Sequence, residues 1–202
     1  MKAEQLNEDL DAYVNVFDNF VAQYQLPAEW FSHPDHFAIK CSDTQDFEET
    51  VESVRESLEP TEFWQIVLDG RRLASAKFSG SITVSSRTQS SVSWVEVMEP
   101  RPGKSSGSPF VEHVEYTYPD FHEVMRILGI RGFDNFELQG NQGHSWVNLV
   151  IDEELGREIK INDRPLYKVI EFENENGLLS SILDPRSGLG AKIIPFPNRG
   201  DK

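Results

Sequence analysis

The stretch HFAIKCSD (residues 36–43) has a counterpart in HVEYTYPD (residues 113–120). Each stretch opens with a histidine, continues as an alternating run typical of a β-strand, and carries an aspartate seven residues after the histidine. That aspartate stands where it can cap the helix-like segment that follows. The two stretches therefore predict that the chain contains two copies of one structural module.

The same order of elements follows both stretches. A helix-like segment comes first, at 43–58 in one copy and 120–128 in the other. Strand-like runs come next, at 62–68, 73–78, 92–99, 135–138, 145–151 and 158–161. We therefore expect an α+β fold of two βαβββ modules that together form an incomplete barrel.

The remaining segments set the expected boundaries of the domain. Residues 3–25 carry apolar side chains at helical spacing and predict an added N-terminal helix outside the repeat. Module one is expected at 34–100 and module two at 110–164, joined by a linker rich in proline and glycine. We expect residues 1–184 to form a single domain and 185–202 to be a loosely ordered tail.

Composition narrows the classes of function. The 202 residues include 13 Phe, 5 Tyr and 4 Trp, and no run approaches the roughly 18 apolar residues of a membrane span. The formal net charge of −15 would repel a phosphate backbone, so nucleic acid and membrane are not expected partners. Cys41 is the single cysteine and the first residues do not resemble a secretory leader, so a cytoplasmic location is expected.

The two histidines that open the repeats are the main clue to function. His36 and His113 occupy the same place in each copy, so a pseudo-twofold axis could bring their imidazoles to one metal ion. A strand histidine is also commonly a half-buried residue with ordinary hydrogen bonds. Both interpretations remain open from the sequence.

Three short motifs carry a resemblance to a known family. DHFAIKC (35–41), VEVMEP (95–100) and VEHVEY (111–116) resemble the vicinal-oxygen-chelate superfamily of glyoxalase I, extradiol dioxygenases and bleomycin-resistance proteins. Within it the chain looks most like the bacterial YecM type, a metal-binding group with a similar N-terminal helix. The turn EPRPG (99–103) is part of that likeness.

The resemblance implies a metal site. The superfamily's ligands map onto His36, Glu99 and His113, a set that suits Zn²⁺, Mn²⁺, Fe²⁺ or Ni²⁺ and leaves positions open for substrate oxygens. The implied activity is that of an isomerase, lyase or dioxygenase acting on a small molecule with two adjacent oxygens. The expected partner is such a substrate, and the oligomeric state is not predicted.

The second module departs from the superfamily pattern. The resemblance implies a fourth carboxylate ligand there, but Lys160 stands at that place, and its charge would oppose a cation. Either the register is displaced, so that Glu158 or Asn162 points inward, or Lys160 meets an anionic substrate.

Other polar residues are secondary candidates. Glu115 shares the strand face of His113 and is a candidate proton acceptor. His144 is a candidate general acid or base at the pocket mouth, although a histidine beside glycine is often simply exposed. Glu96 is expected outside the cavity because it shares a face with Trp94.

Two classes of function therefore compete. The first is a metal-dependent enzyme of the vicinal-oxygen-chelate type. The second is a metal-free module of the same fold that binds a small organic molecule without catalysis, which Lys160 and the many aromatic residues favour.

Overall fold

The computed structural model describes residues 3–68, 70–104, 107–133, 136–141, 144–168 and 180–181. The helices include α1 (Ala3–Tyr24), the short 3-10 helix η1 (Ala28–Phe31), α2 (Thr44–Leu58) and α3 (Phe121–Ile130), and residues 166–168 are also helical. The strands of module one are β1 (Pro34–Lys40), β2 (Glu62–Leu68), β3 (Arg71–Ser85) and β4 (Ser90–Met98). Those that follow are β5 (Phe110–Thr117), β6 (Phe136–Asn141), β7 (His144–Asp152), β8 (Arg157–Asn162) and β9 (Ser180–Ser181).

The element order confirms the predicted duplication. Each module runs strand, helix, strand, strand, strand, and the expected N-terminal helix precedes them. The predicted caps are also present, since the Asp43 and Asp120 side chains accept hydrogen bonds from the backbone N–H groups of Asp46 and Glu123. The chain therefore has the glyoxalase-like α+β fold that the sequence predicts. The expected tail at 185–202 lies outside the described residues.

One curved sheet carries both modules, in the strand order β6-β7-β8-β5-β1-β4-β3-β2-β9. The first strands of the modules, β1 and β5, are antiparallel neighbours at its centre. Each is parallel on its other side to the last strand of its own module, β4 or β8. The sheet is therefore symmetric about an axis between β1 and β5, with the two-residue strand β9 added at one edge.

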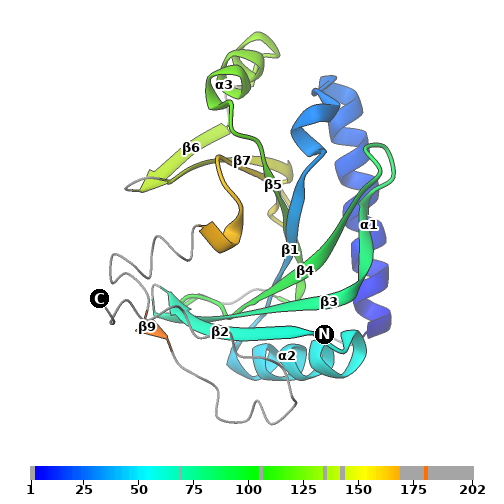
Figure 1. Ribbon diagram of the computed structural model, residues 1–202, viewed down its shortest axis with the longest axis vertical. Coiled ribbons are helices and arrows are strands. Elements are labelled where there is room, and N and C mark those ends of the chain that lie inside the picture. The colour runs from blue at the N-terminus through cyan, green and yellow to red at the C-terminus, as the bar shows by residue number, and fades with distance from the viewer. Residues whose placement is uncertain are drawn as a thin grey trace, which may run out of the picture.

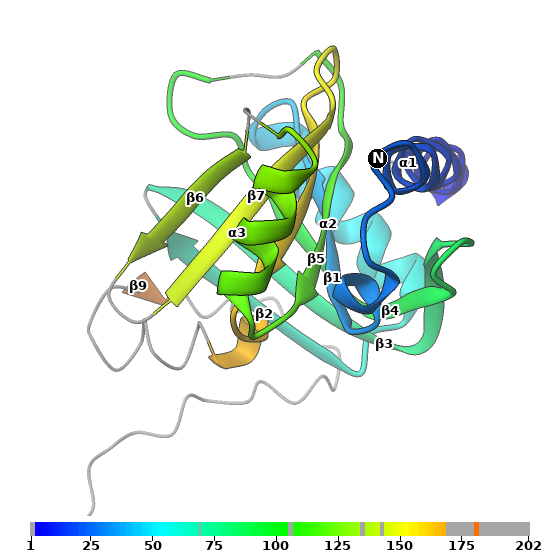
Figure 2. The same ribbon diagram turned by 90° about the horizontal axis from the view of Figure 1, so that it is seen from above.

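The helices cover the outside of the curved sheet (Figure 1). Alternation along β1 sends Phe37 and Ile39 to this outer side, where they join a buried apolar core that includes side chains of α1, α2 and α3. Figure 2 shows α3 over the strands of module two and α1 beside those of module one. The inner, concave face is left without a helix from these three elements, and it receives the polar side chains.

Aromatic packing attaches α1 to the central strands. Phe17 stacks on Tyr116 of β5 with ring centroids 5.7 Å apart, and Phe31 of η1 meets both rings at 5.2 Å. All three side chains are completely buried. Such aromatic pairs contribute about 0.5–1.5 kcal/mol each beyond their buried area. The added helix is thus part of the core. None of the described helices is long and apolar enough to cross a membrane.

The hydroxyl of Tyr13 on α1 bridges two parallel strands. It donates to the carbonyl of Glu158 at 2.7 Å and accepts from the N–H of Val114 at 3.0 Å. Burial raises the pKa of Tyr13 far above its usual value, so the hydroxyl remains protonated and able to donate. The side chain therefore satisfies one backbone group on β5 and one on β8.

Removal of this hydroxyl is expected to destabilise the fold. Tyr13→Phe leaves a buried N–H and a buried C=O without a partner, which costs about 1–3 kcal/mol in the free energy of unfolding. Urea denaturation followed by circular dichroism measures the loss. Tyr24→Phe is the matched control, because the structure gives the Tyr24 hydroxyl no hydrogen bond to a described residue. Equal stability of the two variants would contradict the proposed bridge.

Candidate metal centre

The pairing of β1 with β5 brings the two repeat histidines to the concave face. Alternation along β1 places His36 and Ala38 on this face. In the antiparallel register, His36 lies opposite Glu115 and Ala38 lies opposite His113. Directly opposed residues share a face, so these four side chains form one group.

Glu96 of β4 joins the two histidines. The imidazole centroids of His36 and His113 are 5.9 Å apart, and the ring planes meet at 74°. One ligand atom from each of His36, Glu96 and His113 lies within 4.8 Å of the others. A metal with bonds of roughly 2.0–2.2 Å holds its ligand atoms at most about 4.4 Å apart, so a small inward movement would close the group on an ion.

A small residue at the centre makes this arrangement possible. Ala38 is the direct neighbour of Glu96 on the parallel side and of His113 on the antiparallel side. Its methyl group leaves space that a larger side chain would fill, so the carboxylate and the imidazole can approach each other over it.

Each histidine has an acidic residue directly before it. The Glu112 carboxylate lies 3.2 Å from Nδ1 of His113, and the Asp35 carboxylate lies 3.6 Å from Nδ1 of His36. A carboxylate at Nδ1 favours the tautomer with its proton there and leaves the Nε2 lone pair for a metal. The repeat therefore supplies a supporting acid as well as a ligand in each module.

The Nε2 atoms of both histidines have no hydrogen-bond partner among the described residues. Both residues are only 1% exposed. A buried polar atom without a partner costs about 1–3 kcal/mol, so such atoms rarely occur in one place without a ligand. Two imidazoles with free nitrogens beside a carboxylate fit a divalent metal ion.

Positive charge is favoured at His36. Burial alone would lower its pKa, but the carboxylates of Glu115, Asp35 and Glu96 outweigh burial and raise the pKa to about 9. The acidic neighbours thus stabilise a cation at this position, and a metal ion would take the place of the imidazole proton.

His113 has the opposite electrostatic environment. Burial and the nearby Lys160 ammonium lower its pKa to about 3, against the opposing effect of Glu112. At neutral pH His113 is therefore an uncharged imidazole. It is in the protonation state that a metal ligand needs.

The structure places Glu99 elsewhere, and the expected position of its carboxylate beside the histidines is wrong. Both oxygens contact Arg72, at 2.9 and 3.1 Å, and Oε1 also accepts from the Thr44 hydroxyl. Arg72 lies over the ring of Phe47 on α2, so this cluster is on the outer, helix-covered side of the sheet. Glu96, which was expected outside the cavity, is the carboxylate that faces inward and is 8% exposed.

Of the two candidate acid–base residues, the structure describes the side chain of Glu115. Glu115 is buried, with its carboxylate 3.9 Å from Nε2 of His36. Burial raises the pKa of Glu115 to about 7, against the attraction of His36 and Lys160. His144 begins β7, but its side chain is outside the described part of the structure.

Lys160 takes the place in module two that Glu96 takes in module one. Glu96 is paired with Ala38 of β1, and Lys160 is paired with Glu115, the counterpart of Ala38 on β5. The lysine therefore faces the concave side, and Glu158 and Asn162, two residues away on either side, share that face. Its charge acts on His113 and Glu115.

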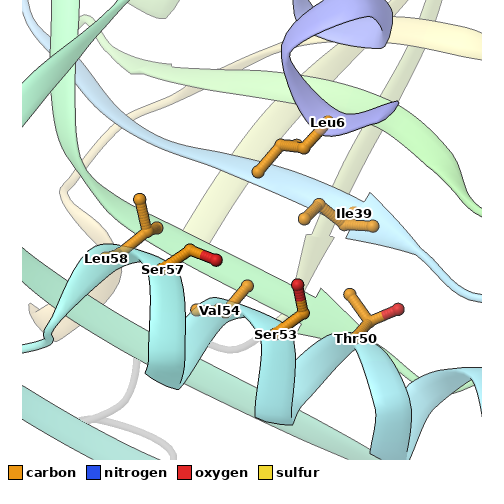
Figure 3. Close-up of a pocket in the computed structure, with 7 residues that line it drawn as sticks. All are labelled: Leu6, Ile39, Thr50, Ser53, Val54, Ser57 and Leu58. Atoms are coloured by element: carbon orange, nitrogen blue, oxygen red, sulfur yellow. The ribbon is translucent and has the colours of Figure 1, made fainter. Parts of the chain in front are cut away.

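A separate small pocket lies on the helix side of the sheet (Figure 3). Its lining comes from α1, β1 and α2: Leu6, Ile39, Thr50, Ser53, Val54, Ser57 and Leu58. Ile39 points away from the face that carries His36 and Ala38, so the pocket does not reach the histidines. Its lining contains no titratable side chain.

Comparisons with known proteins support the fold alone. No family model and no curated protein sequence matches the chain. A solved structural-genomics structure called Protein EC4020 is 16% identical and has a TM-score of 0.66, covering 84% of this chain and 92% of that one. Methylmalonyl-CoA epimerase from Mycobacterium tuberculosis is 16% identical with a TM-score of 0.48, covering 74% and 98%. At 16% identity, the likeness to the first of these structures shows a shared fold.

The position of Glu99 gives a pH-dependent prediction. The hydrogen bonds from Arg72, opposed by partial burial, lower the pKa of Glu99 to about 2. A carboxyl with a depressed pKa stabilises the fold above its ordinary value of 4.5, and this contribution is lost as the pH falls through 2. Glu99→Gln should therefore lower the free energy of unfolding by about 1–3 kcal/mol at pH 7, with the difference vanishing near pH 2.

Urea unfolding at several pH values tests this effect. Glu48→Gln is the control, because Glu48 also contacts Arg72 but its side chain is 55% exposed, so a change below about 0.5 kcal/mol is expected. A pH-independent difference for Glu99→Gln would show that the ion pair is not its cause.

Proposed function

We propose that this protein binds a divalent transition-metal ion through His36, Glu96 and His113, as a YecM-like protein of the vicinal-oxygen-chelate type. The observation that supports this proposal is the convergence of buried, unpartnered imidazole nitrogens on the Glu96 carboxylate. Support also comes from the central position of β1 and β5 in the sheet, because one histidine comes from each module.

The set of donors indicates the kind of metal. Two imidazoles and one carboxylate suit Zn²⁺, Mn²⁺, Fe²⁺ or Ni²⁺, and the set leaves coordination positions for other oxygens. When bound, such an ion would polarise the oxygens of a small substrate. The proposed activity is that of a metal-dependent isomerase, lyase or dioxygenase. The predicted cytoplasmic location stays a prediction.

Glu115 is the residue that we assign to proton transfer. Its buried carboxyl lies beside His36, and its pKa of about 7 lets it both accept and release a proton near neutral pH. Its place opposite His36 puts it at the edge of the metal group, next to any ligand that reaches the ion.

A metal-free binding module is the second candidate. Lys160 faces the same side of the sheet as the histidines, and Trp64 and Trp94 stack edge to face on that side with centroids 6.0 Å apart. These residues could hold an organic molecule without any ion. Metal content distinguishes the two functions.

Loss of any proposed ligand should abolish metal binding. His36→Ala, Glu96→Ala and His113→Ala are each expected to weaken affinity on the order of 100-fold or more, because each removes a direct ligand. Metal analysis of protein prepared without a histidine tag, after equilibration with micromolar Zn²⁺ or Mn²⁺, measures retention. Circular dichroism checks the fold.

Two controls accompany these variants. His33→Ala removes an exposed histidine next to β1, and Glu99→Gln removes the carboxylate on the outer side. Both should retain metal at the wild-type level. A wild-type protein that retains no metal, yet binds a small organic molecule, would favour the metal-free module.

Lys160 gives a prediction in the opposite direction. Lys160→Glu replaces a repelling charge with a carboxylate at the position that matches Glu96 in the repeat. Metal affinity should therefore rise, by roughly tenfold or more. Competition with a metal-binding dye measures the change, and Lys104→Glu on an exposed loop is the control for net charge. An unchanged affinity would show that position 160 does not reach the metal centre.

A further inference from the structure

Polar side chains of module two line the concave face beside the metal group. Lys160 of β8 is paired with Asn148 of β7, so the two side chains share a face. Asn162 lies two residues beyond Lys160 on the same strand and therefore on the same face. Ile159 and Ile161, between them, belong to the core on the other side.

These side chains have unused hydrogen-bonding groups. Asn162 is 2% exposed, and its buried Nδ2 has no partner among the described residues. The same holds for the buried Oδ1 of Asn148, which is an acceptor. The structure shows no hydrogen bond from the Lys160 ammonium to another described residue. An amide donor and an ammonium that share one face without protein acceptors fit an anionic oxygen group.

The charges near the metal group also favour an anion. Glu112 is already paired with Lys40 at 2.6 Å, and Asp35 accepts from the backbone N–H of Leu166. The carboxyl groups of Asp35, Glu96 and Glu115 remain beside the histidines, and the Lys160 ammonium acts on His113 and Glu115 from module two. A divalent cation would offset these carboxyl groups and leave Lys160 as a positive group for an anionic oxygen.

An apolar surface adjoins the same group in module one. Ala38, Leu73 and Met98 form a buried cluster against which Trp64 packs. Ala38 is the neighbour of both Glu96 and His113 in the sheet, so this cluster touches the metal group. The concave face is therefore apolar on one side of the group and carries Lys160 and two asparagines on the other.

We propose that Lys160 and Asn162 receive the carboxylate of a small organic acid, whose adjacent oxygens reach the metal centre and whose apolar part lies toward Trp64. The inference rests on the proposed function for its metal contact only. The lysine and the asparagine belong to the chain itself, so the preference for an anion can be measured with and without metal.

A matched pair of probes tests the charge preference. Mandelate and mandelamide both carry a phenyl ring and two adjacent oxygens, but only mandelate is anionic. Isothermal titration calorimetry on the full chain, loaded with Mn²⁺ or freed of metal by a chelator, gives the ratio of their affinities. In both forms the wild-type protein should bind mandelate roughly tenfold more tightly or better.

Variants assign that preference to the proposed residues. Lys160→Met should remove the preference in metal-free protein and reduce it in the Mn²⁺ form, while Lys160→Arg should keep most of it. Asn148→Asp adds a negative charge and should weaken mandelate more than mandelamide, which gives a second test if Lys160→Met does not fold. Lys104→Met, on an exposed loop, should match the wild type.

The outcomes separate this inference from the proposed function. A preference that persists unchanged in Lys160→Met and Asn148→Asp would overturn the inference, and so would failure of both probes to bind at millimolar concentration. A protein that retains no metal but shows a Lys160-dependent preference would overturn the metal function and support the anion site.

Discussion

The antiparallel pairing of β1 with β5 is the contact on which the rest of the structure depends. It joins the two modules into one sheet and places the axis of the repeat between their first strands. A register shift next to Ala38 lets Glu112 fit as an extra residue on β5, so that His113 lies opposite Ala38. The register is uninterrupted from His36 to Ala38, so both histidines point to the same face.

The two copies keep the same histidine and differ in the charges around it. His36 is surrounded by carboxylates, which favour a positive charge there. His113 lies near Lys160, which together with burial keeps its imidazole neutral. Glu96 and Lys160 occupy equivalent positions in the two modules. The two halves of the concave face therefore carry opposite charges at this position. A symmetric fold thereby gives the proposed cation site and the proposed anion site different charges.

The order of elements and the histidine pair could be predicted from the sequence because both follow local rules, alternation, helical spacing and capping. The sequence did not identify Glu96 as the inward carboxylate. Glu96 was expected outside the cavity because it shares a strand face with Trp94, but the Trp94 ring packs on Trp64 at the concave face. The repeat contained the needed signal. When the last strand of module two is compared with the last strand of module one, the residue equivalent to Lys160 is Glu96 and not Glu99.

The two faces of the sheet differ in whether their buried atoms have partners. The outer faces of β1 and β8 bury Phe37, Ile39 and Ile159 against helices, and this side supplies the hydrophobic stabilisation. The inner face buries His36, His113 and Asn162 with atoms that have no partner in the described part of the chain, each at a cost of about 1–3 kcal/mol. Apolar side chains at these positions would avoid that cost within the same sheet. Retention of the polar set is therefore best explained by a ligand that these atoms bind.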